Sequence, residues 1–426
     1  MSNRIAEAKI QPQARRSRWS SARAILPYLG PAFIVSVGYM DPGNWATDIE
    51  AGSRFNYDLL WVVFASGMIA IFLQILTAKL GIATGRGLAA NCRKHFSRPM
   101  SYFLWVTAEL AMMATDLAEF LGAVIGIHMI FNLPMLTAVW VTGLDVLLFL
   151  FVIRYGYRAF EFIIISLIGF IGLGYLIELV LARPDWVLVA LKSFVPTLNP
   201  DPTFVFVGIG ILGATVMPHN LYLHSTHILT RQNAHSRGKK LFRLASLDTV
   251  LALTAAWWVN AAILIMAAAV FYRNDLLVVS IQAAHRTLIP LLGGFAALVF
   301  AIALLASGLA SSTAGTLAGQ IVMEEFLNIK FPLWLRRLLT RILTMIPAVL
   351  AVSLGVAPVK LMVLSQVALS FQLPFAIIPI VLFTRRRDLM GALVNRPGTT
   401  ALAILIVTLI IALNVLLLVQ IFNIGS

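Results

Sequence analysis

Apolar stretches that are each long enough to cross a lipid bilayer recur along the whole chain. A membrane-spanning helix needs about 20 consecutive apolar residues, because the hydrocarbon core is about 30 Å thick and a helix rises about 1.5 Å per residue. On this criterion the sequence predicts eleven spans, near 24–54 (interrupted), 58–83, 101–130, 135–153, 160–182, 203–231 (interrupted), 246–272, 288–326, 333–354, 358–384 and 399–423. The predicted fold class is an all-α polytopic membrane protein.

The composition agrees with this class. Of the 426 residues, 60% are hydrophobic and only 12% are charged, whereas a soluble domain has about 25% charged residues. So few charged side chains could not cover a core in water, which argues against a soluble enzyme, a disordered protein and a nucleic-acid binder. The apolar excess extends over nearly the whole chain, so we expect one membrane unit rather than several soluble domains.

The distribution of basic residues predicts the orientation, because Lys and Arg collect on the cytoplasmic side of membrane proteins. With a cytoplasmic N-terminus, the tail 1–23 and the alternate loops hold 25 of the 32 Lys and Arg residues, and the outer loops hold six. Eleven spans then place the C-terminus outside. This asymmetry accounts for the net charge of +14 without a nucleic-acid partner. We read basic loops such as 385–387 as topology signals, and the absence of an Asn-x-Ser/Thr sequence suits a bacterial cell (inner) membrane.

Two similar four-residue segments interrupt the first and sixth spans. They are Asp41–Asn44 (DPGN) and Met217–Asn220 (MPHN), 176 residues apart, and both have proline second and asparagine fourth. Proline removes a backbone donor and disfavours a continuous helix, so each span should unwind at this point. A simple proline kink is the alternative, but a kink with an aspartate at mid-membrane, matched in the other half, is less common.

The two interruptions open corresponding five-span halves of opposite orientation. We therefore predict a first repeat over 24–182, an inverted second repeat over 203–384, and an eleventh span, 399–423, outside the repeat. In transporters built in this way the substrate site lies at the midplane between the interrupted helices, where unwound backbone lines a cavity.

The side chains at the interruptions suit a transition-metal cation. A carboxylate such as Asp41 is costly at the midplane unless it has a partner, and the sixth span offers no Lys or Arg at that depth. Asp41 supplies an anionic oxygen, Asn44 a carbonyl oxygen and Met217 a thioether sulfur, and freed carbonyls around Gly38 and Ala214 can add ligands. The sulfur favours Mn²⁺, Fe²⁺, Co²⁺ or Cd²⁺ over Mg²⁺ or Ca²⁺, which prefer oxygen ligands. Packing is the other reading of Met217.

These two segments resemble the paired signature of the Nramp metal-ion transporters, in their bacterial proton-dependent manganese branch. The resemblance covers nearly the whole chain and includes three further motifs: Gly81–Gly85 (GIATG), Ala114–Phe120 (ATDLAEF) and Leu364–Gln366 (LSQ). It implies the inverted five-plus-five helix fold that is shared with amino-acid/sodium symporters. Asn220 stands where close bacterial relatives would have valine, and we place it beyond the ligand set.

The resemblance also implies a set of metal ligands. They are Asp41, Asn44, Met217 and the Ala214 carbonyl, with Gly38 and Gln366 joining in some conformations. Relatives that carry Mg²⁺ lack the methionine, so Met217 again favours a transition metal.

Charged residues within other spans predict a proton route. Glu109, Asp116 and Glu119 share roughly one face of the third span, and Arg336 and Arg337 at the start of the ninth span could pair with that face. Structural salt bridges are the alternative, although ionisable residues within membranes are functional by default.

The predicted route runs from Asp41 and His219 through this acidic face to the cytoplasm, and the family resemblance supports it. Histidine exchanges protons near neutral pH. Burial favours a protonated carboxylic acid and an arriving cation favours the ionised form, so metal entry would expel a proton from Asp41.

Other function classes fit less well. His219, His224 and His227 do not share one helix face, so a multi-histidine iron enzyme is disfavoured. The sequence has no Walker-type phosphate-binding motif, so ATP is not the expected energy source. We therefore expect no enzyme and no resident cofactor, but a proton-coupled importer of divalent transition metal, most simply Mn²⁺. An amino-acid symporter of the same fold is the main alternative, and a channel or signalling protein would require interruptions without ligands.

Overall fold

The computed structural model describes residues 31–146, 157–231, 238–276, 281–330 and 332–424, and side chains are described except at 157–165, 287 and 421–424. Within these ranges every long element is a helix. In chain order the α-helices are α2 (Pro31–Gly38), α3 (Pro42–Phe55), α4 (Leu60–Thr84), α5 (Leu88–His95), α6 (Arg98–Phe131), α7 (Met135–Gly143), α9 (Tyr157–Ala182), α10 (Trp186–Phe194), α11 (Pro202–Val216), α12 (Pro218–His227), α13 (Lys239–Val270), α14 (Ile281–Leu292), α15 (Gly294–Leu327), α16 (Leu333–Ser353), α17 (Pro358–Thr384), α18 (Arg387–Met390) and α19 (Pro397–Ile424).

Seven helical segments in the described part of the chain are long and apolar enough to cross a membrane. They are Leu60–Thr84, Arg98–Phe131, Pro202–Arg231, Lys239–Asn274, Gly294–Leu327, Pro358–Thr384 and Pro397–Gln420. The other predicted spans correspond to the interrupted pair α2 and α3, to α7, to α9 and to the arginine-bearing α16. The predicted basic tail and the end of the fourth span lie outside the described residues.

The predicted eighth span differs from the structure at its start. Gly293 has φ of +93°, a conformation that glycine adopts readily, and it separates the short helix α14 from the long helix α15. The span therefore begins at Gly294 rather than near residue 288. The loops also hold three helices that the apolar pattern did not predict, namely α5, α10 and α18, because short surface helices lack a long apolar stretch.

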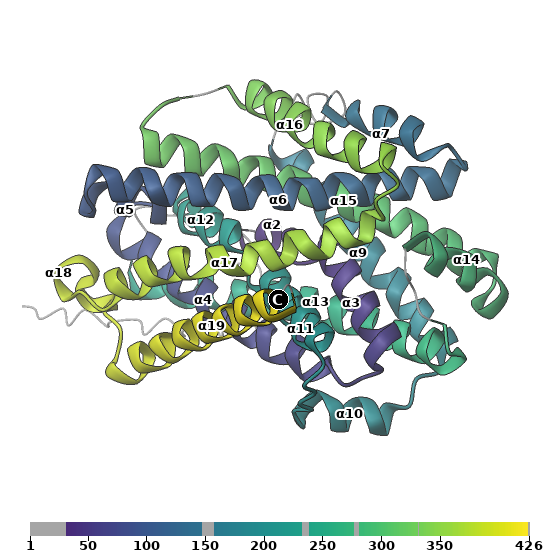
Figure 1. The fold of residues 1–426 in the computed structure, drawn as a ribbon. Helices are drawn as coiled ribbons and strands as arrows, with labels where there is room; N and C mark the ends of the chain where they lie inside the picture. Colours follow the sequence, from purple (N-terminus) through teal and green to yellow (C-terminus); the bar gives the residue numbers. More distant parts are fainter. Residues whose placement is uncertain (1–30, 147–156, 232–237, 277–280, 331, 425–426) are drawn as a thin grey trace, which may run out of the picture.

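Long helices pack side by side through the centre of the molecule (Figure 1). Helix α15 packs along α6, and α17 lies against α6 and α11. The small residues of α15 allow this approach: a Cβ atom on Gly308 would lie 2.8 Å from the Glu119 carbonyl oxygen of α6. In Figure 1, α5 and α18 lie at one end of the bundle and α14 at the other, so loops predicted to be cytoplasmic and outer lie at opposite ends.

Candidate functional site

The first interruption is ordered by Asp41. Its carboxylate caps α3: Oδ1 accepts hydrogen bonds from the backbone N–H of Asn44 at 2.9 Å and from the Asn44 side-chain amide at 2.6 Å. Pro42 occupies the first turn of α3, where a missing N–H costs nothing. The sequence DPGN therefore begins a new helix while it ends α2.

The second interruption lies at Met217, between α11 and α12. Met217 has φ of +38°, which is rare for a residue other than glycine, and Pro218 again occupies the first turn of the following helix. The Met217 side chain is fully buried. Strained backbone of this kind is typical of functional sites.

Direct contacts join the two interruptions. The Asn44 amide donates to the Ala214 carbonyl oxygen at 3.2 Å, and this bond links α3 to α11. Asn260 of α13 donates to the Asn44 Oδ1 atom at 3.2 Å and to the Tyr39 carbonyl at 2.9 Å. Asn260 was not predicted, because its only signal in the sequence is an amide side chain inside an apolar span.

Gln366 of α17 also reaches this site. Gly43 has no side chain, and a Cβ atom there would overlap the Gln366 amide and lie 2.9 Å from Asp41 Oδ2. Glycine at position 43 therefore lets Gln366, which is fully buried, approach the carboxylate. The structure brings together the side chains of Asp41, Asn44 and Gln366.

Asn220 lies closer to the site than the sequence analysis placed it. Its amide donates to the Met217 sulfur at 3.4 Å. The same amide packs on Gly38, where an added Cβ atom would lie 2.5 Å from Asn220 Nδ2. Asn220, in the first turn of α12, therefore contacts two of the predicted ligand residues, and its place outside the ligand set stays a prediction.

Several buried oxygen and nitrogen atoms here have no hydrogen-bond partner among the described residues. They are Asp41 Oδ2, Thr215 Oγ1, Gln366 Oε1, Asn220 Oδ1 and both ring nitrogens of His219. Buried polar atoms are normally satisfied, so a cluster of exceptions indicates a place for a ligand. The mixture of hard oxygens and the Met217 sulfur suits a borderline-soft divalent cation.

The predicted acidic face of α6 is present. Asp116 and Glu119 are buried and converge on Gly315 of α15, where an added Cβ atom would lie 3.1 Å from Asp116 Oδ1 and 3.2 Å from Glu119 Oε2. The two carboxyl groups lie close enough together to influence each other. Asp116, Glu109 and Arg336 line a cavity of about 150 Å³, so this face leads from Glu119 to a hollow in the bundle.

Of the two predicted arginines, Arg336 forms an ion pair with that face. It binds Glu109 through two N–H···O contacts, at 2.6 and 3.1 Å. Arg337 forms its ion pair with Asp145 at 2.7 Å, and Arg341 of the same helix contacts the same carboxylate. Arg337 also lies within the electrostatic range of Asp116 and Glu119, so its part in the acidic face stays a prediction.

A chain of polar side chains that the sequence did not predict leads from α2 to α12. Gln74 of α4 donates to the Tyr39 hydroxyl at 2.8 Å, and its Oε1 atom lies 2.8 Å from His224 Nδ1. All three side chains are buried. These contacts connect the first interruption, through α4, to the second interrupted span.

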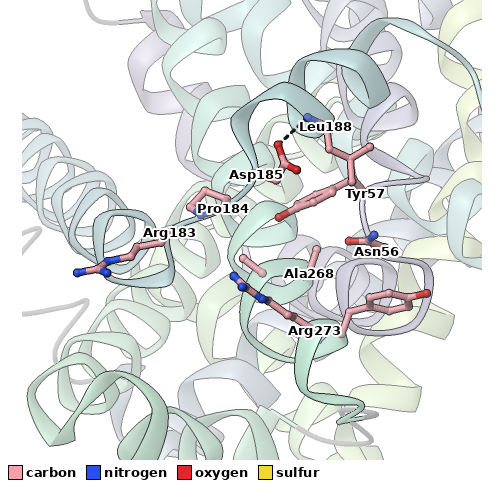
Figure 2. Close-up of a pocket in the computed structure, with 10 residues that line it drawn as sticks. Asn56, Tyr57, Arg183, Pro184, Asp185, Leu188, Ala268 and Arg273 are labelled. Carbon is pink, nitrogen blue, oxygen red and sulfur yellow. Dashed lines mark hydrogen bonds between the residues drawn. The ribbon is translucent and has the colours of Figure 1, made fainter.

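A cavity of about 380 Å³ lies at the ends of α3, α9 and α13 that are predicted to face outward. Figure 2 shows Tyr57 between Asp185 and Arg273, with Arg183 pointing away from them. Asp185 caps α10 by accepting from the backbone N–H groups of Val187 and Leu188.

A polytopic helical protein whose two interrupted helices meet at a buried, partly unsatisfied polar site belongs to the class of membrane transporters. The comparisons with known proteins agree. Residues 32–420 match the family described as Nramp, natural resistance-associated macrophage protein-like. The chain belongs to the Nramp family, whose members are transporters rather than enzymes.

Individual relatives match along most of their length. The chain is 46% identical to a divalent metal cation transporter MntH of Caldanaerobacter subterraneus subsp. tengcongensis, over 93% of each chain. It superposes on a manganese transporter of Eremococcus coleocola with a TM-score of 0.86 at 36% identity, covering 93% of this chain and 87% of that one. Mhp1, a nucleobase-cation-symport-1 family transporter, matches with a TM-score of 0.60 at 16% identity, over 92% of this chain and 90% of that one. The inverted-repeat fold is therefore shared by transporters of different families.

Proposed function

We propose that the protein is a proton-coupled importer of divalent transition-metal ions, with Mn²⁺ the foremost substrate and Fe²⁺, Co²⁺ and Cd²⁺ also accepted. The observation that carries this proposal is the Asp41 carboxylate oxygen that has no partner among the described residues, beside the Asn44–Ala214 hydrogen bond that joins the two interrupted spans. The names of the relatives, divalent metal cation transporter and manganese transporter, support it.

The proposed ligands are Asp41, Asn44, Met217 and the Ala214 carbonyl, with Gly38 and Gln366 contributing in some conformations. Asn44 now donates its amide to Asp41 and Ala214. A metal ion between them would replace the amide hydrogens and turn the Asn44 oxygen toward the cation. The site therefore supplies its own hydrogen bonds when empty and exchanges them for metal bonds when filled.

Coupling follows from the charge of Asp41. A buried carboxylic acid without a cation favours its protonated form, and a divalent cation at the same oxygen favours the ionised form. The arriving metal ion displaces the proton, so the two movements are linked at one atom. The metal is the substrate and the proton the coupling ion, and no resident cofactor or ATP is needed.

The displaced proton leaves by way of His219 and the acidic face of α6. Neither ring nitrogen of His219 has a hydrogen-bond partner among the described residues, so the one that carries no hydrogen can accept the proton. The buried Glu119 carboxyl group, beside Asp116, is the next acceptor. Asp116 and Glu109 continue the route to the cavity beside Arg336. Arg336 and Arg337 neutralise the negative charges of Glu109 and Asp145, respectively, through ion pairs.

Alternating access moves one helix bundle against the other around the site. The topology that we propose has residues 1–23 as a cytoplasmic tail, repeats over 24–182 and 203–384, and the eleventh helix 399–423 ending outside a bacterial inner membrane. Labelling of a Lys192→Cys variant by a membrane-impermeant thiol reagent on whole cells tests this orientation. No labelling from outside would reverse it.

The alternative substrate, an amino acid, is disfavoured by the charge of the site. The N-terminus of α3 is occupied by the Asp41 carboxylate rather than left free for a substrate carboxylate.

Metal selectivity tests the proposal. In proteoliposomes with an inward proton gradient, we expect wild type to take up Mn²⁺, with competition by Cd²⁺ but not by excess Mg²⁺. Met217→Ala should weaken competition by Cd²⁺ by about tenfold and let Mg²⁺ interfere, because a thioether is a soft ligand.

Met362→Ala is the matched control, because Met362 is a fully buried methionine of the core. It should leave the order of competition unchanged. Uptake of an amino acid in place of Mn²⁺ would refute the metal proposal and leave the fold intact.

A further inference from the structure

A second group of buried acidic side chains lies between the metal site and the outer cavity. Asp48 of α3 is 1% exposed, and Tyr175 and Glu178 of α9 are 2% and 1% exposed. The proton route described above uses none of them. They lie on the opposite side of Asp41 from Glu119, along the half of α3 that is predicted to run outward.

An aromatic contact fixes the relative height of the two helices. The rings of Trp45 (α3) and Tyr175 (α9) meet edge to face, with centroids 4.8 Å apart. Asp48 follows Trp45 by three residues and Glu178 follows Tyr175 by three, so each acid lies on the same helix face, about 4.5 Å further along. Both helices are predicted to run outward, and the two acids therefore lie at a similar level above the contact.

The polar atoms of this group are buried without partners. Asp48 Oδ2, Tyr175 Oη and Glu178 Oε2 form no hydrogen bond among the described residues. The Tyr175 hydroxyl lies within the electrostatic range of both carboxyl groups, and Asp48 lies within that of Asp41. In the described ranges neither carboxyl group forms an ion pair with Lys, Arg or His. An ionised carboxylate in such surroundings is strongly disfavoured, so each acid needs a cation or a proton.

The group extends from the metal site to the outer cavity. Asp48 follows Asp41 by seven residues on one face of α3, a rise of about 10.5 Å. At the other end, α9 stops at Ala182, four residues after Glu178, and the next residue, Arg183, lines the cavity of Figure 2. Asn56, the residue after α3, lines the same cavity.

We propose that Glu178, Tyr175 and Asp48 form a relay that carries the coupling proton from the outer cavity to Asp41. This inference rests on the proposed proton-coupled function and adds the outer half of the route. A proton is the cation that fits. A divalent ion needs about six ligands, and the aromatic rings of Trp45 and Phe300 pack around this place instead of further oxygens.

Each transfer exchanges one O–H bond for another. At rest Glu178, Tyr175 and Asp48 each hold a proton, so neither buried carboxyl group is left ionised. When Asp41 Oδ2 is ionised, Asp48 gives its proton to Asp41 through water and receives the Tyr175 Oη proton, and Tyr175 receives the Glu178 proton, so the phenol stays neutral. A hydronium ion from the cavity, acting through water, restores the proton of Glu178 Oε2 and is left as water.

The test measures Mn²⁺ uptake and proton uptake on the same proteoliposomes, with one dye for each ion. In Glu178→Gln, Asp48→Asn and Tyr175→Phe, we expect Mn²⁺ uptake to stay within about twofold of wild type and Mn²⁺-driven proton uptake to fall at least about tenfold. Glu178→Asp keeps a carboxyl group and should restore most of the proton uptake.

Matched controls separate a relay from a change in packing. Glu50→Gln removes a carboxyl group two residues from Asp48 that pairs with Arg54, and Tyr222→Phe removes another buried tyrosine hydroxyl, in α12. Both should keep the wild-type ratio of protons to Mn²⁺.

The outcomes distinguish this inference from the function on which it rests. If wild type takes up Mn²⁺ without protons, the proposed coupling fails and the relay with it. Alternatively, wild type takes up protons together with Mn²⁺ while the three variants keep the wild-type ratio of protons to Mn²⁺, either at full rate or with both uptakes reduced in proportion. In that case the relay is wrong and the proposed function stands. A loss of one bound Mn²⁺ per protein in Glu178→Gln, measured by titration with Mn²⁺ alone, would replace the relay by a second metal site.

Discussion

At the residue scale, Asn220 contacts the proposed metal site without belonging to the proposed ligand set. Its amide hydrogen bonds to the Met217 sulfur, and its own oxygen has no partner among the described residues. A metal ion that bound the sulfur would compete with this hydrogen bond, which is worth about 0.5–1.5 kcal/mol. We therefore expect Asn220 to weaken the attraction of the proposed site for soft cations.

Asn220→Val removes this competition. We expect Cd²⁺ to bind about threefold to tenfold more tightly, as measured by calorimetric titration of the detergent-solubilised protein. Mn²⁺ binding should change less, because Mn²⁺ depends less on sulfur. Weaker binding of Cd²⁺ would contradict this account and would make the Asn220 oxygen a ligand.

Gly43 is the glycine where an added side chain would meet the proposed metal site. In Gly43→Ala the new methyl group overlaps the Gln366 amide beside Asp41. We expect Mn²⁺ uptake to fall by about tenfold, because a displacement of about 1 Å at a site can cost that much. Gly169→Ala is the control, since nothing lies within 4 Å of a Cβ atom there. Equal uptake by both variants would remove Gln366 from the site.

At the scale of elements, α16 is held to α15 and to Asp145, two residues after the end of α7, by buried charge. Arg337 and Arg341 share the Asp145 carboxylate, and Arg337 also donates to Ser312 and Thr316 of α15. Breaking a buried ion pair costs far more than breaking an exposed one, because the remaining charge is left without a partner. This cluster therefore fixes the position of the helix that carries Arg336.

Asp145→Asn should destabilise the protein by about 3–5 kcal/mol, since two buried guanidinium groups lose their carboxylate. The measurement is the melting temperature in detergent. A large enough loss of stability would leave the variant unfolded already at the growth temperature. Asp388→Asn breaks the exposed pair with Arg386 and should leave the melting temperature unchanged. The account of the cluster fails if both variants melt alike.

The elements that could be predicted are those that depend on local sequence. Apolar length located the long helices, and proline beside a polar residue located both interruptions. Partners that belong to distant helices could not be predicted: the sequence does not say that Arg337 faces Asp145 or that Gln74 lies between Tyr39 and His224. The same limit explains Asn220, whose place depends on the positive φ of Met217.

At the scale of the whole molecule, the fold alone does not determine which substrate is transported. Mhp1 shares the architecture at 16% identity, although it belongs to a different transporter family. Function is decided by the residues placed at the interruptions rather than by the helix arrangement. In this chain those residues are a carboxylate, two amides and a thioether, with the acids of α3, α6 and α9 around them.

The central claim is that metal and proton exchange at Asp41. The most direct test is Mn²⁺-driven proton uptake in proteoliposomes, compared between wild type and Asp41→Asn, with Mn²⁺ entry recorded in parallel. We expect wild type to acidify the lumen as Mn²⁺ enters, and we expect Asp41→Asn to lose all Mn²⁺-linked proton movement. Mn²⁺-driven acidification that persists in Asp41→Asn at the wild-type rate would contradict the account.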